Sequence, residues 1–313
     1  MIEAMVLGGT NNTFEVESQD GMVRLCSIKG KILRESEGYY NPLAPGDRVS
    51  VEVDEHDPKR GQIINLLPRK NHFVRWNQKG KSPQLLASNL DLAVVVTTPA
   101  EPPFRPRFVD RALIQADAER IEPLILLNKS DLPQDPDLEE RMEDWKRLGY
   151  EIIRVSAHTG DGLDVLAARL EGRLSAFVGQ SGVGKSSLLN ALDTRLSLRT
   201  AGLSAKYGRG THTTTRGMLF HLPPGESGKS ASIIDTPGVR RFVLHGIEAR
   251  DLALYFREME ALVGTCSWGH SCTHEHEPGC KILEAVYAGV IHEQRYESWQ
   301  RIRDELETGR WTD

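Results

Sequence analysis

The sequence predicts a multi-domain protein with a small N-terminal β-barrel (1–72), a central α/β unit (90–244) and a mainly helical C-terminal metal-binding domain (245–313). Three patterns predict this organisation: short alternating runs broken by turn residues, then strands alternating with helices, then three of the four cysteines within fifteen residues. An apolar content of 39% and a charged content of 27% are typical of a globular chain and exclude a disordered or fibrous one.

The N-terminal region is predicted to be an antiparallel barrel of five strands, of the OB-fold type. Val49, Val51 and Val53 alternate with polar residues, and turn signals such as Asp20-Gly21 recur every few residues. Residues 73–89 are expected to be a basic linker, because the stretch KGKSP combines turn-forming and charged residues.

The charge distribution is uneven. Thirty-nine basic and 44 acidic residues give a net charge of −5, which does not indicate a polyanion binder. The bases nevertheless gather in two windows without any acid, 58–90 and 194–225. The first contains Phe73 and Trp76, which favours either RNA binding by phosphate neutralisation and base stacking or a solvated linker. No export signal or long apolar stretch is visible, so we expect a cytoplasmic protein without membrane contact.

The central region alternates strands and helices. Its buried-strand runs are LDLAVVVTT, PLILLNK, EIIRVSA, LSAFVGQ and ASIIDTP. Between them, helical patterns place residues such as Leu138, Met142, Trp145 and Leu148 on one face. This alternation predicts a mostly parallel sheet covered by helices on both faces.

A glycine-rich loop with the pattern G-x-x-x-x-G-K-S follows the strand LSAFV and precedes the helix SSLLNAL. Its backbone N–H groups can surround phosphate oxygens, Lys185 can reach the β- and γ-phosphates with a catalytic role, and Ser186 can ligate Mg²⁺. We assign phosphate binding to Gly179, Gln180, Ser181, Gly182, Val183, Gly184, Lys185, Ser186 and Ser187.

Two strand ends are expected to read the base. The Asp131 carboxylate can accept hydrogen bonds from the N1–H and the exocyclic amine of guanine, whereas adenine offers no matching pair. A backbone N–H at Ser156-Ala157 can meet the guanine O6. We therefore assign GTP and GDP recognition to Asn128, Lys129, Ser130, Asp131, Ser156 and Ala157.

The sequence DTPG follows the strand ASII. Asp235 is placed to hold Mg²⁺ through water, and the Gly238 N–H is placed to sense the γ-phosphate. A threonine of the basic loop is expected to complete the Mg²⁺ shell; we favour Thr215, with Thr214 as the alternative and a solvated loop as the competing interpretation.

Many GTPases carry a glutamine after DTPG that orients the attacking water. Val239 stands there in this chain and cannot form a side-chain hydrogen bond. His212 in the basic loop is the candidate for positioning the water, and the alternative is that it contacts RNA or solvent.

The order of the motifs is unusual. NKSD and SA precede the glycine-rich loop, and the threonine loop and DTPG follow it, whereas ordinary GTPases begin with the glycine-rich loop. The same site can form because closure in space does not depend on where the chain is cut. The sequence thus predicts a circularly permuted P-loop G domain.

A Cys/His cluster lies beyond the G domain. Three thiolates and one imidazole suit tetrahedral structural zinc with no open position. We assign the zinc ligands to Cys266, Cys272, His274 and Cys280; His270 and His276 are alternative ligands, and an unmetallated thiol set is the alternative for the whole cluster.

Taken together, the motif order, the barrel and the Cys/His segment resemble the small ribosomal subunit biogenesis GTPase A family of bacteria. The resemblance covers nearly the whole chain and includes the stretches GDRV (46–49), PRKN (68–71), RGTHTTT (209–215) and EPGC (277–280). It implies a GTPase that binds the immature small (30S) ribosomal subunit and its rRNA, with slow hydrolysis to GDP and phosphate that the subunit stimulates. It also points to His212 as the residue beside the attacking water.

The resulting hypothesis is a monomeric GTP hydrolase that assists late maturation of the small subunit and leaves after hydrolysis, with one structural Zn²⁺ and with Mg²⁺ accompanying GTP. One alternative is a GTP-gated RNA- or ribosome-binding module in which hydrolysis is incidental. The other is a GTPase that acts on another RNA or on a translation factor.

Overall fold

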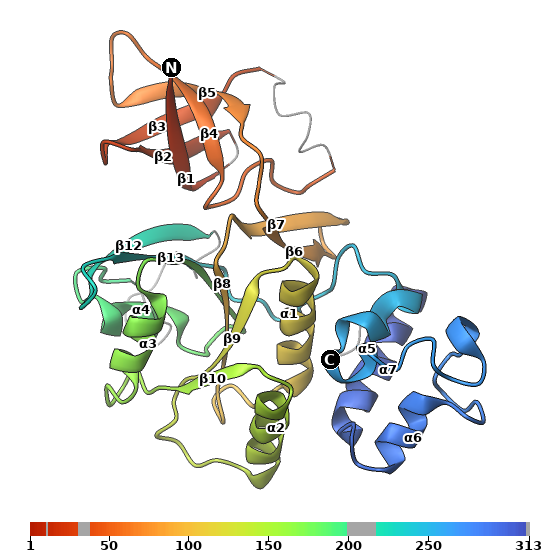
Figure 1. Cartoon of the computed structure of the whole chain (residues 1–313). Helices are drawn as coiled ribbons and strands as arrows, with labels where there is room; N and C mark the ends of the chain where they lie inside the picture. Colours follow the sequence, from red (N-terminus) through yellow and green to blue (C-terminus); the bar gives the residue numbers. More distant parts are fainter. Residues whose placement is uncertain (11, 31–37, 199–216, 311–313) are drawn as a thin grey trace.

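The computed structural model describes residues 1–10, 12–30, 38–198 and 217–310. Figure 1 shows a barrel at the N-terminus, a sheet flanked by helices in the middle and a group of helices at the C-terminus. Within the described ranges, none of the helices has the length and apolar content that a bilayer-spanning segment requires. His212, Thr214 and Thr215 lie outside these ranges, so the predictions made for them remain predictions.

The N-terminal region is a closed five-stranded barrel. Its strands are β1 (Ile2–Thr10), β2 (Thr13–Ser18), β3 (Val23–Ile28), β4 (Arg48–Val53) and β5 (Arg60–Leu66). They pair in the order β1-β2-β3-β5-β4, and β4 pairs back with β1. Val16, Val49 and Val51 are fully buried because alternate side chains of each strand point inward. The predicted OB-like barrel is confirmed.

The central sheet is mostly parallel, as expected. Its parallel strands are β8 (Leu92–Thr97), β9 (Glu122–Leu127), β10 (Glu151–Arg154), β11 (Leu174–Gly179) and β13 (Ser230–Asp235). They lie in the order β10-β9-β8-β11-β13. The antiparallel strand β12 (Met218–Pro224) lies next to β13 in the sheet and also pairs with β1, through Gly8 and Met218. The barrel therefore continues the edge of the central sheet.

Helices cover both faces of this sheet. On one face, α1 (Pro106–Ala118) and α2 (Pro136–Arg147) pack with Val95 and Ile125. On the other, α3 (Leu163–Leu170) and α4 (Lys185–Leu192) pack with Val94 and Leu126. Successive strand residues enter opposite cores, which explains the continuous apolar runs in the sequence.

The segment expected to be a basic linker, 73–89, is instead part of a β-hairpin. Strand β6 (His72–Asn77) pairs with β7 (Ser82–Ser88), and KGKSP supplies the turn and the first residues of β7. Phe73 is fully buried and its ring lies 5.4 Å from that of Phe242, while the Trp76 N–H donates to the Val243 carbonyl at 2.9 Å. The hairpin forms because residues 242–243 pack on it, a contact far away in sequence.

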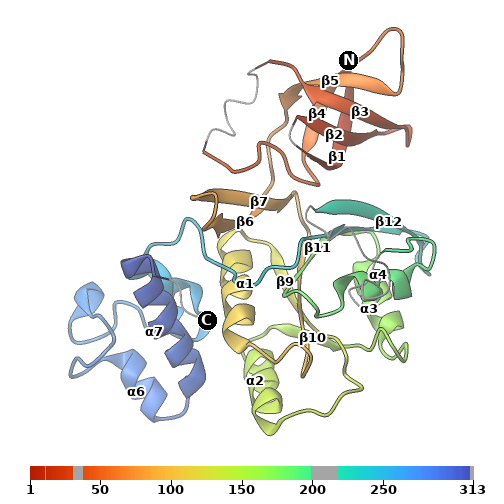
Figure 2. The same ribbon diagram turned by 180° about the vertical axis from the view of Figure 1, so that it is seen from behind.

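The C-terminal region is mainly helical, as predicted. It contains the 3₁₀ turns η3 (Ala249–Tyr255) and η4 (Gly269–Ser271) and the helices α5 (Arg257–Glu260), α6 (Lys281–Tyr287) and α7 (Glu293–Thr308). Trp299 and Ile302 on α7 are buried, while Arg301 between them is exposed, so the helix is amphipathic. The two opposite views agree that α7 lies beside α1 (Figure 2).

A buried ion network joins α7 to the helices of the central unit. The Arg295 guanidinium is fully buried and donates at 2.6 Å both to Asp110 of α1 and to Glu258 of α5. Arg141 of α2 donates to the same Asp110 at 3.0 Å. Because unpaired buried charges are strongly destabilising, this network holds the C-terminal helices in a defined place against α1 and α2.

Candidate functional site

The predicted nucleotide-binding residues meet at the carboxyl ends of the parallel strands. In open α/β sheets ligands bind at this edge, because the loops after neighbouring strands converge there. The glycine-rich loop follows β11 and leads into α4, NKSD follows β9, Ser156-Ala157 follow β10, and DTPG begins at the end of β13. Four motifs that are spread over about a hundred residues thus reach one place.

The glycine-rich loop has the backbone that a phosphate cradle requires. Gly182 and Gly184 have φ values of +88° and +89°, which L side chains rarely adopt. A Cβ atom on Gly184 would lie 2.4 Å from Asn128 Nδ2. Lys185 Nζ donates to the carbonyl oxygens of Gly179 at 2.9 Å and Gln180 at 3.2 Å. Burial lowers the pKa of Lys185 to about 8, while the nearby Asp235 opposes this shift.

Ser186 and Asp235 form a polar pair beside this lysine. Ser186 Oγ donates to Asp235 Oδ2 at 3.4 Å, and the buried Asp235 Oδ1 has no hydrogen-bond partner among the described residues. Burial raises the pKa of Asp235 to about 6, although Lys185 and Ser186 act in the opposite direction. A carboxylate oxygen without a partner next to a serine hydroxyl suits a hard cation such as Mg²⁺.

This pKa leads to a pH prediction. We expect Mg²⁺-dependent GTP affinity to fall by about tenfold between pH 7 and pH 5, because Asp235 becomes protonated as the pH falls through about 6 and the neutral acid holds a cation poorly. Titration with a fluorescent GTP analogue at each pH measures it. Asp235→Asn is the matched control, since it removes the carboxyl group but keeps the titration of the nucleotide. Identical pH profiles for both proteins would contradict the prediction.

Asn128 connects the base-reading motifs to the glycine-rich loop. Its Nδ2 donates to the Val183 carbonyl at 2.8 Å, and its Oδ1 accepts from the Ala157 N–H at 3.2 Å. Asp131 Oδ1 accepts from Ser156 Oγ at 2.6 Å, which lowers the pKa of Asp131 and keeps it ionised at neutral pH. A pocket of about 340 Å³ opens here; its lining includes Asn128, Lys129, Asp131, Ala157, Gly184 and Ser187.

Three further residues line this pocket and escaped the sequence analysis: Glu101, Leu132 and His158. Glu101 contributes through its backbone, since its carbonyl oxygen accepts a hydrogen bond from Lys129 Nζ. A main-chain contribution from the loop between β8 and α1 leaves no signal in the residue pattern.

DTPG lies directly against the glycine-rich loop. The Thr236 hydroxyl donates to the Phe177 carbonyl at 2.7 Å, and the Val239 N–H donates to the Gly179 carbonyl at 3.2 Å. A Cβ atom on Gly238 would lie 2.9 Å from Ser181 Cα, so only glycine allows this approach. The Val239 side chain is buried in the same core as Phe242. It therefore takes no part in orienting a water molecule.

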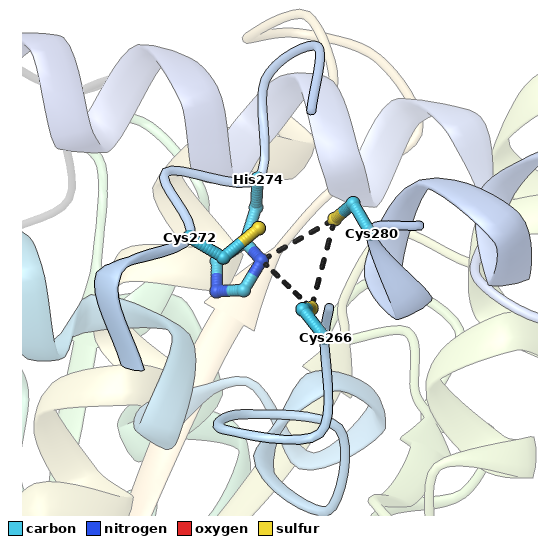
Figure 3. Close-up of side chains that lie close together, drawn as sticks. All are labelled: Cys266, Cys272, His274 and Cys280. Carbon is cyan, nitrogen blue, oxygen red and sulfur yellow. Dashed lines mark hydrogen bonds between the residues drawn. The ribbon is translucent and has the colours of Figure 1, made fainter. Parts of the chain in front are cut away.

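The Cys/His cluster forms in the C-terminal region. The ligand atoms of Cys266, Cys272, His274 and Cys280 lie within 4.8 Å of one another (Figure 3). His274 Nδ1 is 3.6 Å from Cys266 Sγ and 3.4 Å from Cys280 Sγ, and the two sulfurs are 3.9 Å apart. Tetrahedral zinc with Zn–S bonds of about 2.3 Å requires sulfur separations of about 3.8 Å, so the donor set fits a closed metal site.

Neighbouring groups orient these ligands. The backbone N–H of Lys281 donates to Cys266 Sγ at 3.2 Å, and the Tyr296 hydroxyl donates to the His274 carbonyl at 2.6 Å. Burial raises the pKa of Cys272 to about 12, so a metal ion must displace the thiol proton. The alternative ligands His270 and His276 are exposed and lie outside the cluster.

Comparison with known proteins agrees with this geometry. A family model described as RsgA GTPase matches residues 66–245. The small ribosomal subunit biogenesis GTPase RsgA of Chlorobaculum parvum is 39% identical over 313 residues, covering 98% of each chain. The crystal structure of YjeQ from Thermotoga maritima has a TM-score of 0.72 at 31% identity, with 99% of each chain covered. YloQ, a circularly permuted GTPase, has a TM-score of 0.67 at 25% identity, covering 100% of this chain and 97% of its own. The chain belongs to the RsgA GTPase family.

Proposed function

We propose that this protein hydrolyses GTP to GDP and phosphate during maturation of the small (30S) ribosomal subunit. The observation that carries the proposal is the double hydrogen bond of Asn128, which joins the base-reading loops to the phosphate loop around one pocket. Relatives that match nearly the full length are named small ribosomal subunit biogenesis GTPases, and this name supports the small subunit as the partner. We also propose that the protein acts in the cytoplasm and as a monomer.

The geometry supports a division of labour at the nucleotide. Asp131 would hold the guanine edge, and the Ala157 N–H would meet O6. Lys185 would exchange its hydrogen bonds to the loop carbonyls for contacts with the β- and γ-phosphates. Gly238, which lies against Ser181, would sense the γ-phosphate. Mg²⁺ would be held by Ser186 and Thr215 with Asp235 through water, and it would neutralise phosphate charge.

We keep His212 as the residue proposed to position the attacking water. Supporting this is the burial of Val239, which leaves the position after DTPG without a polar side chain. The same burial supports the alternative of a GTP-gated binding module with incidental turnover. His212 and Thr215 lie outside the described residues, so their roles rest on the sequence alone.

We propose that the metal of the Cys/His cluster is zinc and that its role is structural. Three thiolates and one imidazole form the closed set that zinc takes in structural sites, with no position left for a substrate. The cysteines also belong to a core cluster with Ile282 and Trp299. The ion would therefore stabilise the packing of α6 and α7.

The barrel and the hairpin β6–β7 are the proposed rRNA-contacting elements. Lys79 lies exposed in the hairpin turn, and Lys81 lies exposed just before β7. Phe73, expected from the sequence to stack on bases, is fully buried and is not available for that role. The contact would consist mainly of phosphate neutralisation and would weaken as salt increases.

Steady-state GTP hydrolysis with and without purified small subunits tests the proposal. We expect small subunits to raise turnover by about tenfold or more, as activators of slow GTPases do. Large subunits and ATP serve as controls and should have no effect and no turnover, respectively. Slow turnover that neither subunit changes would favour the GTP-gated binding module. Stimulation by another RNA or by a translation factor would favour the second alternative.

A further inference from the structure

A second pocket, of about 350 Å³, lies beside the glycine-rich loop, and its lining includes one of the nucleotide-binding residues assigned above, Gln180. It is enclosed by the beginning of α1, by the segment after DTPG and by α7. Its charged lining consists of five arginines and one acid: Arg105, Arg107, Arg111, Arg240, Arg241 and Glu305. None of these arginines belongs to either acid-free window of the sequence, so the pocket is a separate concentration of positive charge.

Positive charge exceeds negative charge in this pocket. Glu305 is almost fully buried and accepts a hydrogen bond from Arg111 at 2.5 Å. Burial lowers the pKa of Arg107, and the neighbouring charges of Arg301 and Arg111 lower it further, against the opposing effect of Glu305 and Glu297. An anion in this pocket would relieve the repulsion between like charges.

Two polar side chains in the lining have unused hydrogen-bonding capacity. Gln180 of the glycine-rich loop is only 9% exposed, and its side chain forms no hydrogen bond with any described residue. Arg240 is exposed and makes no ion pair within the described part of the chain. A buried amide and a guanidinium facing the same space can both donate to one oxygen-rich ligand.

We propose that this pocket binds a phosphate group of an RNA backbone and links that contact to the GTP site. Guanidinium groups donate paired hydrogen bonds to phosphate oxygens, which makes a cluster of arginines the side-chain set suited to this ligand. The choice of RNA rests on the proposed function, because a maturing ribosomal subunit presents backbone phosphates at its surface.

The link to GTP follows from what the pocket wall is made of. Gln180 is a residue of the phosphate loop, and Arg240 comes two residues after Gly238, the proposed γ-phosphate sensor. The backbone N–H of Val239, between Gly238 and Arg240, donates to the carbonyl of Gly179, the residue before Gln180, at 3.2 Å. A ligand on Arg240 and Gln180 therefore bridges the two segments that GTP is expected to order, and coupling of this kind is reciprocal.

Fluorescence anisotropy with a labelled single-stranded RNA of mixed sequence tests the proposal on the full-length protein. The double variant Arg107→Ala/Arg240→Ala should bind RNA more weakly, with the slope of log affinity against log salt reduced by about 0.7 for a single lost phosphate contact. RNA should bind the wild type more tightly with a non-hydrolysable GTP analogue than with GDP. In the variant this difference should shrink.

Matched controls separate the pocket from general charge and folding effects. Arg250→Ala removes an exposed arginine paired with Glu248 and Asp251 outside the pocket and should keep the wild-type slope. Arg240→Lys keeps the charge without the forked donor and should fall between wild type and Arg240→Ala. Thermal unfolding checks that each variant is folded.

Several outcomes would overturn the proposal. One is an unchanged salt slope in the double variant, and another is an equal loss of RNA affinity in Arg250→Ala. A third is that polyglutamate displaces the labelled RNA at a lower concentration of negative charges than unlabelled RNA does. If inorganic pyrophosphate binds the wild type more tightly than the double variant but RNA binds both equally, the pocket is a site for free phosphate, and the proposal is overturned as well. If small subunits stimulate the double variant as strongly as the wild type, the pocket has no role in this stimulation, and the proposed function still holds. If the wild type is not stimulated, the proposed function fails and the RNA slope still decides the pocket.

Discussion

Replacing Asp131 with asparagine is expected to lower GTP affinity by about 100-fold or more and to create binding of xanthosine triphosphate. The carboxylate offers two acceptors to the two donors on the guanine edge. Asparagine offers one acceptor and one donor, so the guanine amine would lose its acceptor and face a donor instead. Xanthine has a carbonyl in place of that amine and would match asparagine.

The position of Asp131 supports an effect of this size. Its carboxylate stands at the wall of the 340 Å³ pocket and is oriented by the Ser156 hydroxyl at 2.6 Å. Competition between guanosine and xanthosine nucleotides for a fluorescent probe measures the change in preference. Asp137→Asn, an exposed acid in the first turn of α2, is the control and should leave the preference unchanged. A wild-type ratio in Asp131→Asn would remove this residue from base recognition.

Replacing Cys280 with serine is expected to remove the metal and to lower the free energy of unfolding of the C-terminal region by at least about 3 kcal/mol. Serine is a poor zinc ligand, and the remaining three donors leave an open coordination position. Cys280 is also the N-cap of α6 and is buried in a core shared with Ile282 and Trp299. Loss of the ion would therefore loosen both α6 and α7.

Metal analysis and urea unfolding measure this effect. Cys26→Ala is the matched control, because Cys26 is a buried cysteine in the barrel and lies outside the cluster. It should keep one equivalent of zinc, as should His270→Ala and His276→Ala. A full equivalent of zinc in Cys280→Ser, or unchanged stability after chelation of the wild type, would contradict the assignment.

Features that depend on local backbone and spacing could be predicted from the sequence. Gly182 and Gly184 adopt positive φ angles that follow from the loop motif itself. The thiols of Cys266 and Cys280 are only fourteen positions apart in the sequence, so they meet within one short segment. Alternating apolar residues predicted the strands of the barrel, and continuous apolar runs predicted the buried strands of the parallel sheet. Both patterns are local, because the side chains of a strand alternate between its two faces with a period of two residues.

Features that depend on distant contacts were decided by the tertiary structure. Residues 73–89 have the composition of a linker, yet they form a hairpin because Phe242 and Val243 pack on it from more than 150 residues away. The arginine pocket combines α1, the segment after DTPG and α7.

By itself, the sequence determined which kinds of site the protein has, a permuted guanine-nucleotide pocket and a Cys₃His cluster. Both consist of short motifs whose geometry is local. Only the tertiary structure decided that Phe73 and Val239 are buried, that Asn128 joins two loops, and that Arg295 fastens α7 to α1 through Asp110. The physical reason is that burial and pairing depend on which surfaces meet, and surfaces far apart in the chain meet only when the whole chain has folded.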